Sequence, residues 1–206
     1  MVVVEFKVIG IAGVARVGKD TFCESLIDIL KSQGIKAQRV AFADALKQDI
    51  ASLLEEKLGH KWVDKLGVNP YIKDKEIIRP LYVAYGKLMR DLTQDAHWVN
   101  KVKEKVETNR KKNIISLISD VRYADEVNWI NSTRGGATVY LNREGFHPIN
   151  EEEVINDPLA RSKCTYQVQW TTETEGSTPT FLESLRQQTL HHLNASPELL
   201  PGINRP

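Results

Sequence analysis

The sequence has few cysteines and no long run of apolar residues. Only Cys23 and Cys164 occur, so a disulfide framework cannot be the basis of the fold, and a reducing compartment is expected. No cysteine and histidine spacing matches a zinc site. The opening Val2–Val4 run is broken at once by Glu5 and Lys7, so we expect neither a signal peptide nor a membrane-spanning helix. We therefore predict a cytoplasmic protein.

Net charge is also nearly absent, with a formal value of +1 at pH 7. No global excess of charge favours a nucleic acid or a membrane as partner, and we expect neither. Any phosphate site must instead come from a local cluster of basic groups. The length of 206 residues corresponds to about one domain, which we place at residues 1–194. Residues 195–206 hold three prolines and a glycine and are expected to form a flexible tail.

Short apolar segments alternate with segments of helical periodicity along the chain. We expect strands over residues 6–12, 37–43, 113–119, 137–141 and 166–170. We expect helices over residues 19–31, 45–58, 80–92, 95–108, 124–132 and 180–193. This alternation predicts an α/β fold whose sheet of about five strands is largely parallel, with helices on both faces. Ligands of such sheets bind at the carboxyl ends of the strands.

The segment GVARVGKDT, residues 13–21, follows the first expected strand and opens the first expected helix. It contains the G-x-x-x-x-G-K pattern, in which Gly13 and Gly18 let the backbone wrap around a polyphosphate and Lys19 supplies a mobile cation. The alternative is a glycine-containing turn with a solvated lysine, but the strand–loop–helix context favours nucleotide binding. The predicted ATP-binding residues of this loop are Gly13, Val14, Ala15, Arg16, Val17, Gly18, Lys19, Asp20 and Thr21. Arg16 either reaches a phosphate or is simply solvated.

Asp20 departs from the usual pattern, which places a hydroxyl directly after the lysine to ligate Mg²⁺. Thr21 can take the metal role, or Asp20 can contact the ion or the phosphate acceptor. Asp20 can also serve only as a first-turn acid that favours the positive end of a helix. We predict Thr21, Asp20 and Asp120 as the metal ligands.

Charged residues also follow two other expected strands. Asp120 can hold the water shell of Mg²⁺ or position the acceptor, and Arg122 can bridge the donor and acceptor phosphates, although the two can also be a weak surface pair. Asp44 and Lys47 can hold a sugar hydroxyl or a phosphate, or Asp44 can cap the next helix.

Two arginines and a tryptophan are candidates for acceptor recognition. Arg79 and Arg90 are eleven residues apart, close to three helical turns, so one helix face can carry both. Planar bidentate donors suit a phosphate, and the alternative is that both are solvated. Trp98 can stack on a base, but a core position is the more common one for tryptophan.

The stretch from residue 143 to 163 is long, polar and interrupted by two prolines. We predict a lid that closes over the nucleotide and excludes water, with Arg143 and Arg161 reaching the phosphates. The alternative is an ordinary long loop. We interpret the three acids Glu151–Glu153 as the solvated start of a helix.

Four segments together resemble the bacteriophage-type deoxynucleoside monophosphate kinases. They are GVARVGKDT (13–21), FADALK (42–47), RPLYVAYGKLMRDLTQDAHWV (79–99) and ISDVRYADEVNWI (118–130), and the resemblance covers about residues 6–193. It implies a P-loop kinase three-layer sandwich with an acceptor-binding helical region at about 45–110 and a lid at about 143–163. It also implies Mg²⁺-dependent phosphoryl transfer from ATP to a deoxynucleoside monophosphate, by a homodimer that works in the host cytoplasm if phage-encoded.

The residue chemistry given above and the resemblance together give the predicted roles. Lys19, Asp20 and Arg122 would be catalytic. The acceptor would contact Asp44, Lys47, Arg79, Arg90, Trp98, Asp120 and Arg122. Gly86-Lys87-Leu88 departs from the small polar and acidic pair usual in the family, and residues 59–71 have no counterpart.

Two other functions stay open at this point. SDVRY, residues 119–123, partly resembles the Asp-Arg-aromatic motif of thymidylate kinases, so another small-molecule P-loop kinase, for thymidylate, dephospho-coenzyme A or phosphomevalonate, is an alternative. A non-catalytic nucleotide switch is the other. Against it, the chain has no Asn-Lys-x-Asp guanine-reading motif and no apolar run closed by adjacent acids.

Overall fold

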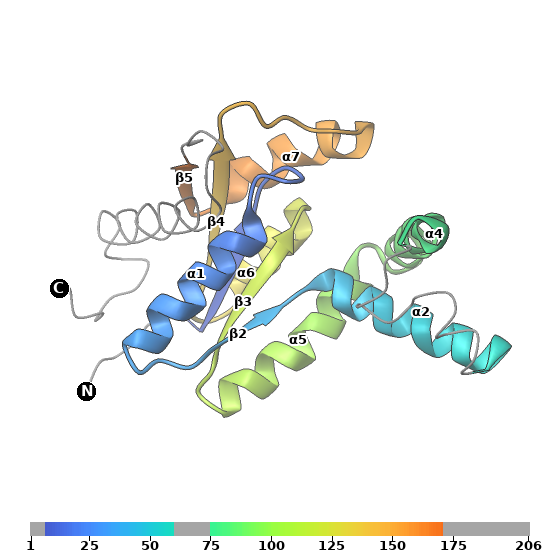
Figure 1. Ribbon diagram of the computed structural model, residues 1–206, viewed down its shortest axis with the longest axis horizontal. Helices are drawn as coiled ribbons and strands as arrows, with labels where there is room; N and C mark the ends of the chain where they lie inside the picture. The colour runs from blue at the N-terminus through green and yellow to red at the C-terminus, as the bar shows by residue number, and fades with distance from the viewer. Residues whose placement is uncertain (1–6, 60–74, 171–206) are drawn as a thin grey trace. The chain divides into compact units, whose positions relative to one another are not determined.

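The computed structural model describes residues 7–59 and 75–170 (Figure 1). Two compact units make up the chain, the first from Met1–Val40 with Val106–Pro206 and the second from Ala41–Lys105. The second unit overlaps the helical region expected at about 45–110. The expected helix at 180–193, the tail at 195–206 and nearly all of the loop at 59–71 lie outside the described residues.

Five strands and six helices are present in the described ranges. The strands are β1 (Val8–Ala12), β2 (Ala37–Val40), β3 (Ile115–Val121), β4 (Gly136–Arg143) and β5 (Tyr166–Trp170). The helices are α1 (Lys19–Ser32), α2 (Phe42–Leu58), α4 (Lys75–Thr93), α5 (Ala96–Lys111), α6 (Ala124–Ser132) and α7 (Glu151–Lys163). Among these described elements, no helix is both long enough and apolar enough to span a lipid bilayer.

The five strands of the first unit form one sheet in the order β2-β3-β1-β4-β5. Every neighbouring pair is parallel, which confirms the predicted α/β class and parallel sheet. After β1 the chain forms β2 and β3 on one side of β1, and it then crosses β1 to form β4 and β5 on the other side. The crevice at the carboxyl end of β1 is therefore a topological switch point, where α/β sheets place their ligands.

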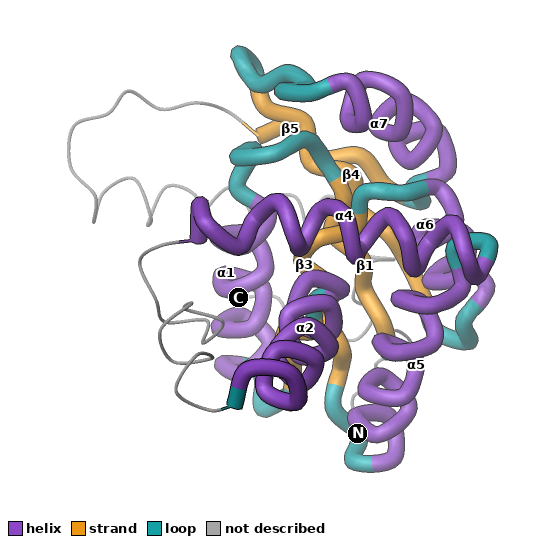
Figure 2. Tube along the Cα trace, turned by 90° about the vertical axis from the view of Figure 1, so that its right-hand side faces the viewer, coloured by secondary structure: helices purple, strands orange, loops and turns teal. Residues whose placement is uncertain are grey.

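The two faces of β1 are covered by different helices. Ile9 and Ile11 join a buried cluster with Phe22 of α1, so this face of the sheet packs on α1. Gly10 points to the opposite face, where an added Cβ would lie 2.6 Å from Cδ1 of Ile130 in α6. Figure 2 shows the strands running between α1 and α6. The sheet is thus buried on both sides, which explains why its central strands are almost continuously apolar.

Two helix starts differ from the predictions. Helix α2 begins at Phe42 rather than at residue 45, and its N-cap is Ala41, so Asp44 is not the cap but a first-turn acid. Helix α4 begins at Lys75, so Pro80 lies inside it instead of near its start. The prediction relied on the preference of proline for the first turn. Ile78, two residues before the proline, is buried, and its packing stabilises the helical turn upstream of Pro80.

The second unit has its own small core. Ile50 of α2 and Ile78 of α4 are buried together, and Leu46, Leu54 and Tyr82 pack against them. Each of these two helices therefore places an apolar stripe toward the other, as amphipathic helices do.

Candidate functional site

The loop between β1 and α1 needs glycine at both ends. Gly13 has φ 142° and Gly18 has φ 104°, and Arg16 between them also has a positive φ of 65°. A Cβ on Gly13 would lie 2.7 Å from the carbonyl oxygen of Leu141 in β4. The backbone thus turns sharply and passes close to the neighbouring strand, a path that glycine permits and other residues resist. This is the loop that the G-x-x-x-x-G-K pattern predicts.

Hydrophobic residues anchor the same loop in the core. Val14 and Val17 are 5% and 1% exposed, and both belong to the cluster between the sheet and α1. Arg16, by contrast, is exposed. The two valine side chains thus anchor the loop in the core, while the polar backbone of the loop remains at the end of the sheet.

Lys19 opens α1 and folds back over the loop. Its Nζ donates hydrogen bonds to the carbonyl oxygens of Gly13 at 2.7 Å and Val14 at 2.8 Å. Burial, together with the positive charge of Arg122, lowers the pKa of Lys19 to about 8, although nearby carboxylates oppose both effects. At neutral pH the ammonium is therefore largely protonated, but its charge is poorly solvated.

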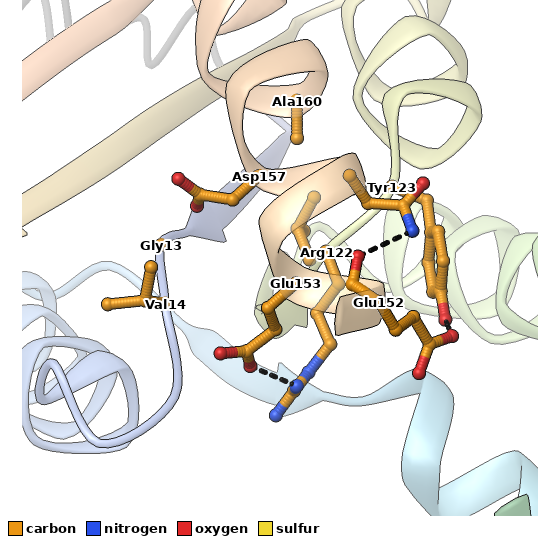
Figure 3. Close-up of a pocket in the computed structure, with 10 residues that line it drawn as sticks. Gly13, Val14, Arg122, Tyr123, Glu152, Glu153, Asp157 and Ala160 are labelled. Atoms are coloured by element: carbon orange, nitrogen blue, oxygen red, sulfur yellow. Dashed lines mark hydrogen bonds and ion pairs between the residues drawn. The ribbon is translucent and has the colours of Figure 1, made fainter. Parts of the chain in front are cut away.

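The end of β3 and the helix α7 meet the loop around one cavity (Figure 3). Its volume is about 20 Å³, which is on the order of one or two water molecules. The lining residues are Gly13, Val14, Val121, Arg122, Tyr123, Glu152, Glu153, Asn156, Asp157 and Ala160. The structure thus brings Arg122 to the same place as the loop, as expected of two segments that follow the carboxyl ends of parallel strands.

The turn from β3 to α6 is held by a buried carboxylate. Glu126, 3% exposed, accepts hydrogen bonds from the backbone N–H groups of Arg122 at 2.8 Å and Tyr123 at 3.1 Å. The backbone that carries the Arg122 guanidinium is therefore fixed, while the side chain itself remains 45% exposed.

Glu153 is the main residue that sequence reasoning missed. It is 8% exposed, and its Oε1 accepts from Nη1 of Arg122 at 2.7 Å. Its Oε2 accepts from the backbone N–H groups of Ile149 at 3.2 Å and of Ala15 at 3.4 Å. The interpretation of Glu151–Glu153 as a solvated helix start is therefore wrong for Glu153.

A local signal for this arrangement was present in the sequence. Asn150 is the N-cap of α7, and its Oδ1 accepts from the N–H of Glu153 at 2.8 Å. An Asn-x-x-Glu spacing is typical of a capped helix start whose glutamate turns back over the first turn. The spacing indicates that Glu153 folds back, but not that it meets Arg122.

Residues 143–163, predicted as the lid, are mostly not loop. Arg143 is the last residue of β4, and the helix α7 occupies Glu151–Lys163. Neither predicted arginine of this stretch lines the cavity: the guanidinium of Arg143 lies 4.6 Å from the ring centroid of Phe146, and that of Arg161 lies 5.1 Å from that of Tyr140. The segment does cover the loop, but through the acidic face of α7.

Asp157 adds a second acid from α7 to the cavity. Both of its carboxylate oxygens lie 2.9 Å from Oη of Tyr140, which donates to them. Burial raises the pKa of Asp157, and the hydrogen bond from Tyr140 partly offsets that effect.

The predicted magnesium ligands differ in their surroundings. Asp20 forms an ion pair with Arg39, with 3.3 Å between Oδ1 and Nε. Thr21 lies in the first turn of α1, and Asp120 lies in β3 directly before Val121, the partner of Ala12 in β1. In the described part of the chain, no three or more His, Cys, Asp and Glu side chains form a metal-binding group. The side-chain oxygens of Thr21, Asp20 and Asp120 are all hard ligands of the kind that Mg²⁺ takes, and Asp20 differs in that it also pairs with Arg39.

Five of the seven predicted acceptor residues belong to the second unit, which we describe by itself: Asp44, Lys47, Arg79, Arg90 and Trp98. The other two, Asp120 and Arg122, belong to the first unit. Asp44 and Lys47 form an ion pair of 3.7 Å on the first turns of α2. Arg79 is exposed on α4.

The other two have partners that hold the unit together. Arg90 also lies on α4, as predicted, but its side chain is 12% exposed and pairs with Asp95 at 3.0 Å. Trp98 is 4% exposed, and its Nε1 donates to the carbonyl oxygen of Gly86 at 3.1 Å. Of the two interpretations of Trp98, the geometry favours the core position.

No model of a known protein family matches this chain, and no curated protein matches it either.

Proposed function

We propose that this protein is a P-loop kinase, with the three-layer sandwich of that fold, that transfers the γ-phosphoryl group of ATP to a deoxynucleoside monophosphate. The observation that carries the proposal is the loop from Gly13 to Gly18, which joins a central parallel strand to a helix N-terminus and has Lys19 folded over it. Arg122 from the adjacent strand lines the cavity at the same loop.

The chemistry follows from these groups. Loop amides and the N-terminus of α1 favour the charge of a polyphosphate. The Lys19 ammonium needs only to rotate from the carbonyl oxygens of Gly13 and Val14 to follow the transferring group. Arg122 supplies a planar donor for the charge that develops on the phosphoryl oxygens.

Magnesium would supply neutralisation of the phosphate charge, with Thr21 and Asp120 as the protein groups that hold it. The carboxylate of Asp120 already raises the pKa of Lys19, so it acts electrostatically on the same site. Asp20 would serve mainly as the partner of Arg39 in the first turn of α1.

The choice of acceptor rests on the resemblance over residues 42–47 and 79–99. In that assignment the exposed Arg79 of α4 and the Asp44–Lys47 pair of α2, in which Lys47 is partly buried, contact the acceptor. Arg90 has a supporting role through Asp95. The same resemblance is the basis for proposing a homodimer, which sedimentation velocity of the purified protein tests directly.

A coupled assay of ADP release tests the function. ATP and Mg²⁺ are supplied with each of the four deoxynucleoside monophosphates, the ribonucleotides and dephospho-coenzyme A. We expect stimulation by one or more deoxynucleotides and a loss of at least about a hundredfold in Lys19→Ala. Lys31→Ala, at an exposed position in the last turn of the same helix, is the matched control and is expected to retain activity.

The outcomes separate the alternatives. Stimulation by dephospho-coenzyme A alone would identify another small-molecule kinase. ATP binding without stimulation by any acceptor would refute the kinase proposal and favour a nucleotide switch.

A further inference from the structure

One carboxylate lies where the donors of the loop converge. Oε1 of Glu153 is 2.7 Å from Nη1 of Arg122, and its Oε2 is 3.4 Å from the backbone nitrogen of Ala15 (Figure 3 shows the contact with Arg122). These two donors are groups that the proposed function assigns to phosphate oxygens. A carboxylate oxygen and a phosphate oxygen are both anionic and accept hydrogen bonds at similar distances, so one can take the place of the other.

Capping of the helix does not explain this position. Asn150 already caps α7 by accepting from the N–H of Glu153. A role at the helix start accounts for the contact of Glu153 with the N–H of Ile149, but it does not require contacts with Ala15 and Arg122, which belong to other elements.

Occupied donors and negative charge both oppose a phosphate beside Glu153. The Oε atoms of Glu153 already accept the hydrogen bonds of the Arg122 guanidinium and of the Ala15 amide, so a phosphate oxygen cannot use these donors at the same time. Glu152 and Asp157 line the cavity as well, so the wall formed by α7 is acidic. A bound polyphosphate and Glu153 in its present position therefore exclude each other.

We propose that Glu153 is an internal anion that occupies the phosphate loop in the nucleotide-free protein and is displaced when a polyphosphate binds. The proposal rests on the proposed function, in that the loop must bind a polyphosphate. Displacement breaks the ion pair with Arg122 and moves the first turn of α7 away from Ala15. Arg122 is thereby released toward the phosphates only when a nucleotide is present, so that α7 acts as a gate.

Binding titrations by calorimetry test the proposal, with ATP and with inorganic tripolyphosphate as probes. Glu153→Gln keeps the shape of the side chain and removes its charge, so we expect both probes to bind roughly tenfold more tightly than to the wild type. Glu151→Gln removes the same charge from an exposed position in the same helical turn and is expected to change the affinity by less than about twofold. Thermal unfolding of each variant checks that the fold is retained.

Hydrogen exchange gives a second readout. On addition of tripolyphosphate to the wild type, the amide of Ile149 loses its acceptor and is expected to exchange faster, whereas the amide of Ala15 gains a phosphate oxygen and is expected to exchange more slowly. A purely structural role for Glu153 would leave the amide of Ile149 unchanged.

The possible results are distinct. Tighter binding by Glu153→Gln alone, with the exchange changes, supports the proposal, even if no acceptor stimulates ADP release and the kinase proposal itself fails. Equal tightening by Glu151→Gln, or unchanged or weaker binding by Glu153→Gln, overturns it. If neither the wild type nor Glu153→Gln binds ATP or tripolyphosphate, both proposals are refuted.

Discussion

Lys19 has a position that should cost stability in exchange for function. The residue is 8% exposed, and burial together with the charge of Arg122 lowers its pKa to about 8. Methionine has a similar length and shape but no charge. We therefore expect Lys19→Met to abolish the proposed phosphoryl transfer and yet to raise the free energy of unfolding.

The magnitude follows from two opposing effects. A pKa lowered from 10.5 to about 8 corresponds to about 3.5 kcal/mol of unfavourable free energy for the charged lysine, at ~1.4 kcal/mol per pH unit. Methionine removes that cost, but it also removes the hydrogen bonds to the carbonyl oxygens of Gly13 and Val14, which contribute about 1.5 kcal/mol each because the donor is charged. The two effects nearly balance, and we expect a net gain in the free energy of unfolding of about 0.5 kcal/mol at pH 7.

The pH dependence gives a sharper test than the value at one pH. Below pH 8 Lys19 is protonated in both the folded and the unfolded state, so the full cost is present. Between pH 8 and 10.5 the folded state loses this proton first, and the wild-type free energy of unfolding rises with pH through this group. The advantage of Lys19→Met should therefore be largest near neutrality and shrink toward pH 10.

Urea unfolding followed by circular dichroism at pH 7 and at pH 9.5 measures both quantities. Lys31→Met, at an exposed position of the same helix, controls for loss of a lysine in general and should change the stability by less than about 0.5 kcal/mol. A Lys19→Met variant that is destabilised at pH 7, with a difference from wild type that does not depend on pH, would refute the reasoning and show that the loop carbonyl contacts dominate.

Two further predictions concern packing and charge away from the loop. A Cβ on Gly136 would lie 1.8 Å from a carbonyl oxygen of α6, so Gly136→Ala should lower the free energy of unfolding by about 3 kcal/mol. Gly145→Ala is the control, because a Cβ there meets nothing within 4 Å and only the φ of 81° is strained, and it should lower the free energy of unfolding by about 1 kcal/mol. Equal losses of the two variants in urea unfolding would contradict this account. Burial alone would raise the pKa of Asp49, but hydrogen bonds from Lys101 and His97 lower this pKa below 3.8. The stability that the Asp49 carboxylate contributes is therefore present above pH 3.8 and is lost as the pH falls through the lowered pKa. Asp49→Asn should thus cost about 1–2 kcal/mol at pH 7, and the difference from wild type should narrow in acid unfolding; a difference that stays constant below pH 3.8 would argue against the charge as its cause.

The sequence alone was sufficient wherever a feature depends on a few neighbouring residues. The helix at 124–132 and the strand at 166–170 have the predicted bounds, because hydrophobic periodicity and flanking breakers are local signals. The turn between Gly13 and Gly18 was equally predictable, since the positive φ angles that it requires restrict the residue type.

Helix ends were less predictable, because they depend on what the helix packs against. Proline at position 80 suggested a start, but burial of Ile78 against Ile50 extends α4 upstream. Asp44 had the right residue type for a cap and lies instead in the first turn of α2, which begins at Phe42.

The composition of the site was decided by the tertiary structure. Glu153 is separated from Arg122 by 31 residues and from Ala15 by 138, and no local pattern specifies contacts over such distances. Arg161 was expected at the phosphates but lies over the ring of Tyr140. These contacts form only because the parallel sheet places β1 beside β3 and β4, and so gathers α7 and the loop after β1 at one end of the sheet.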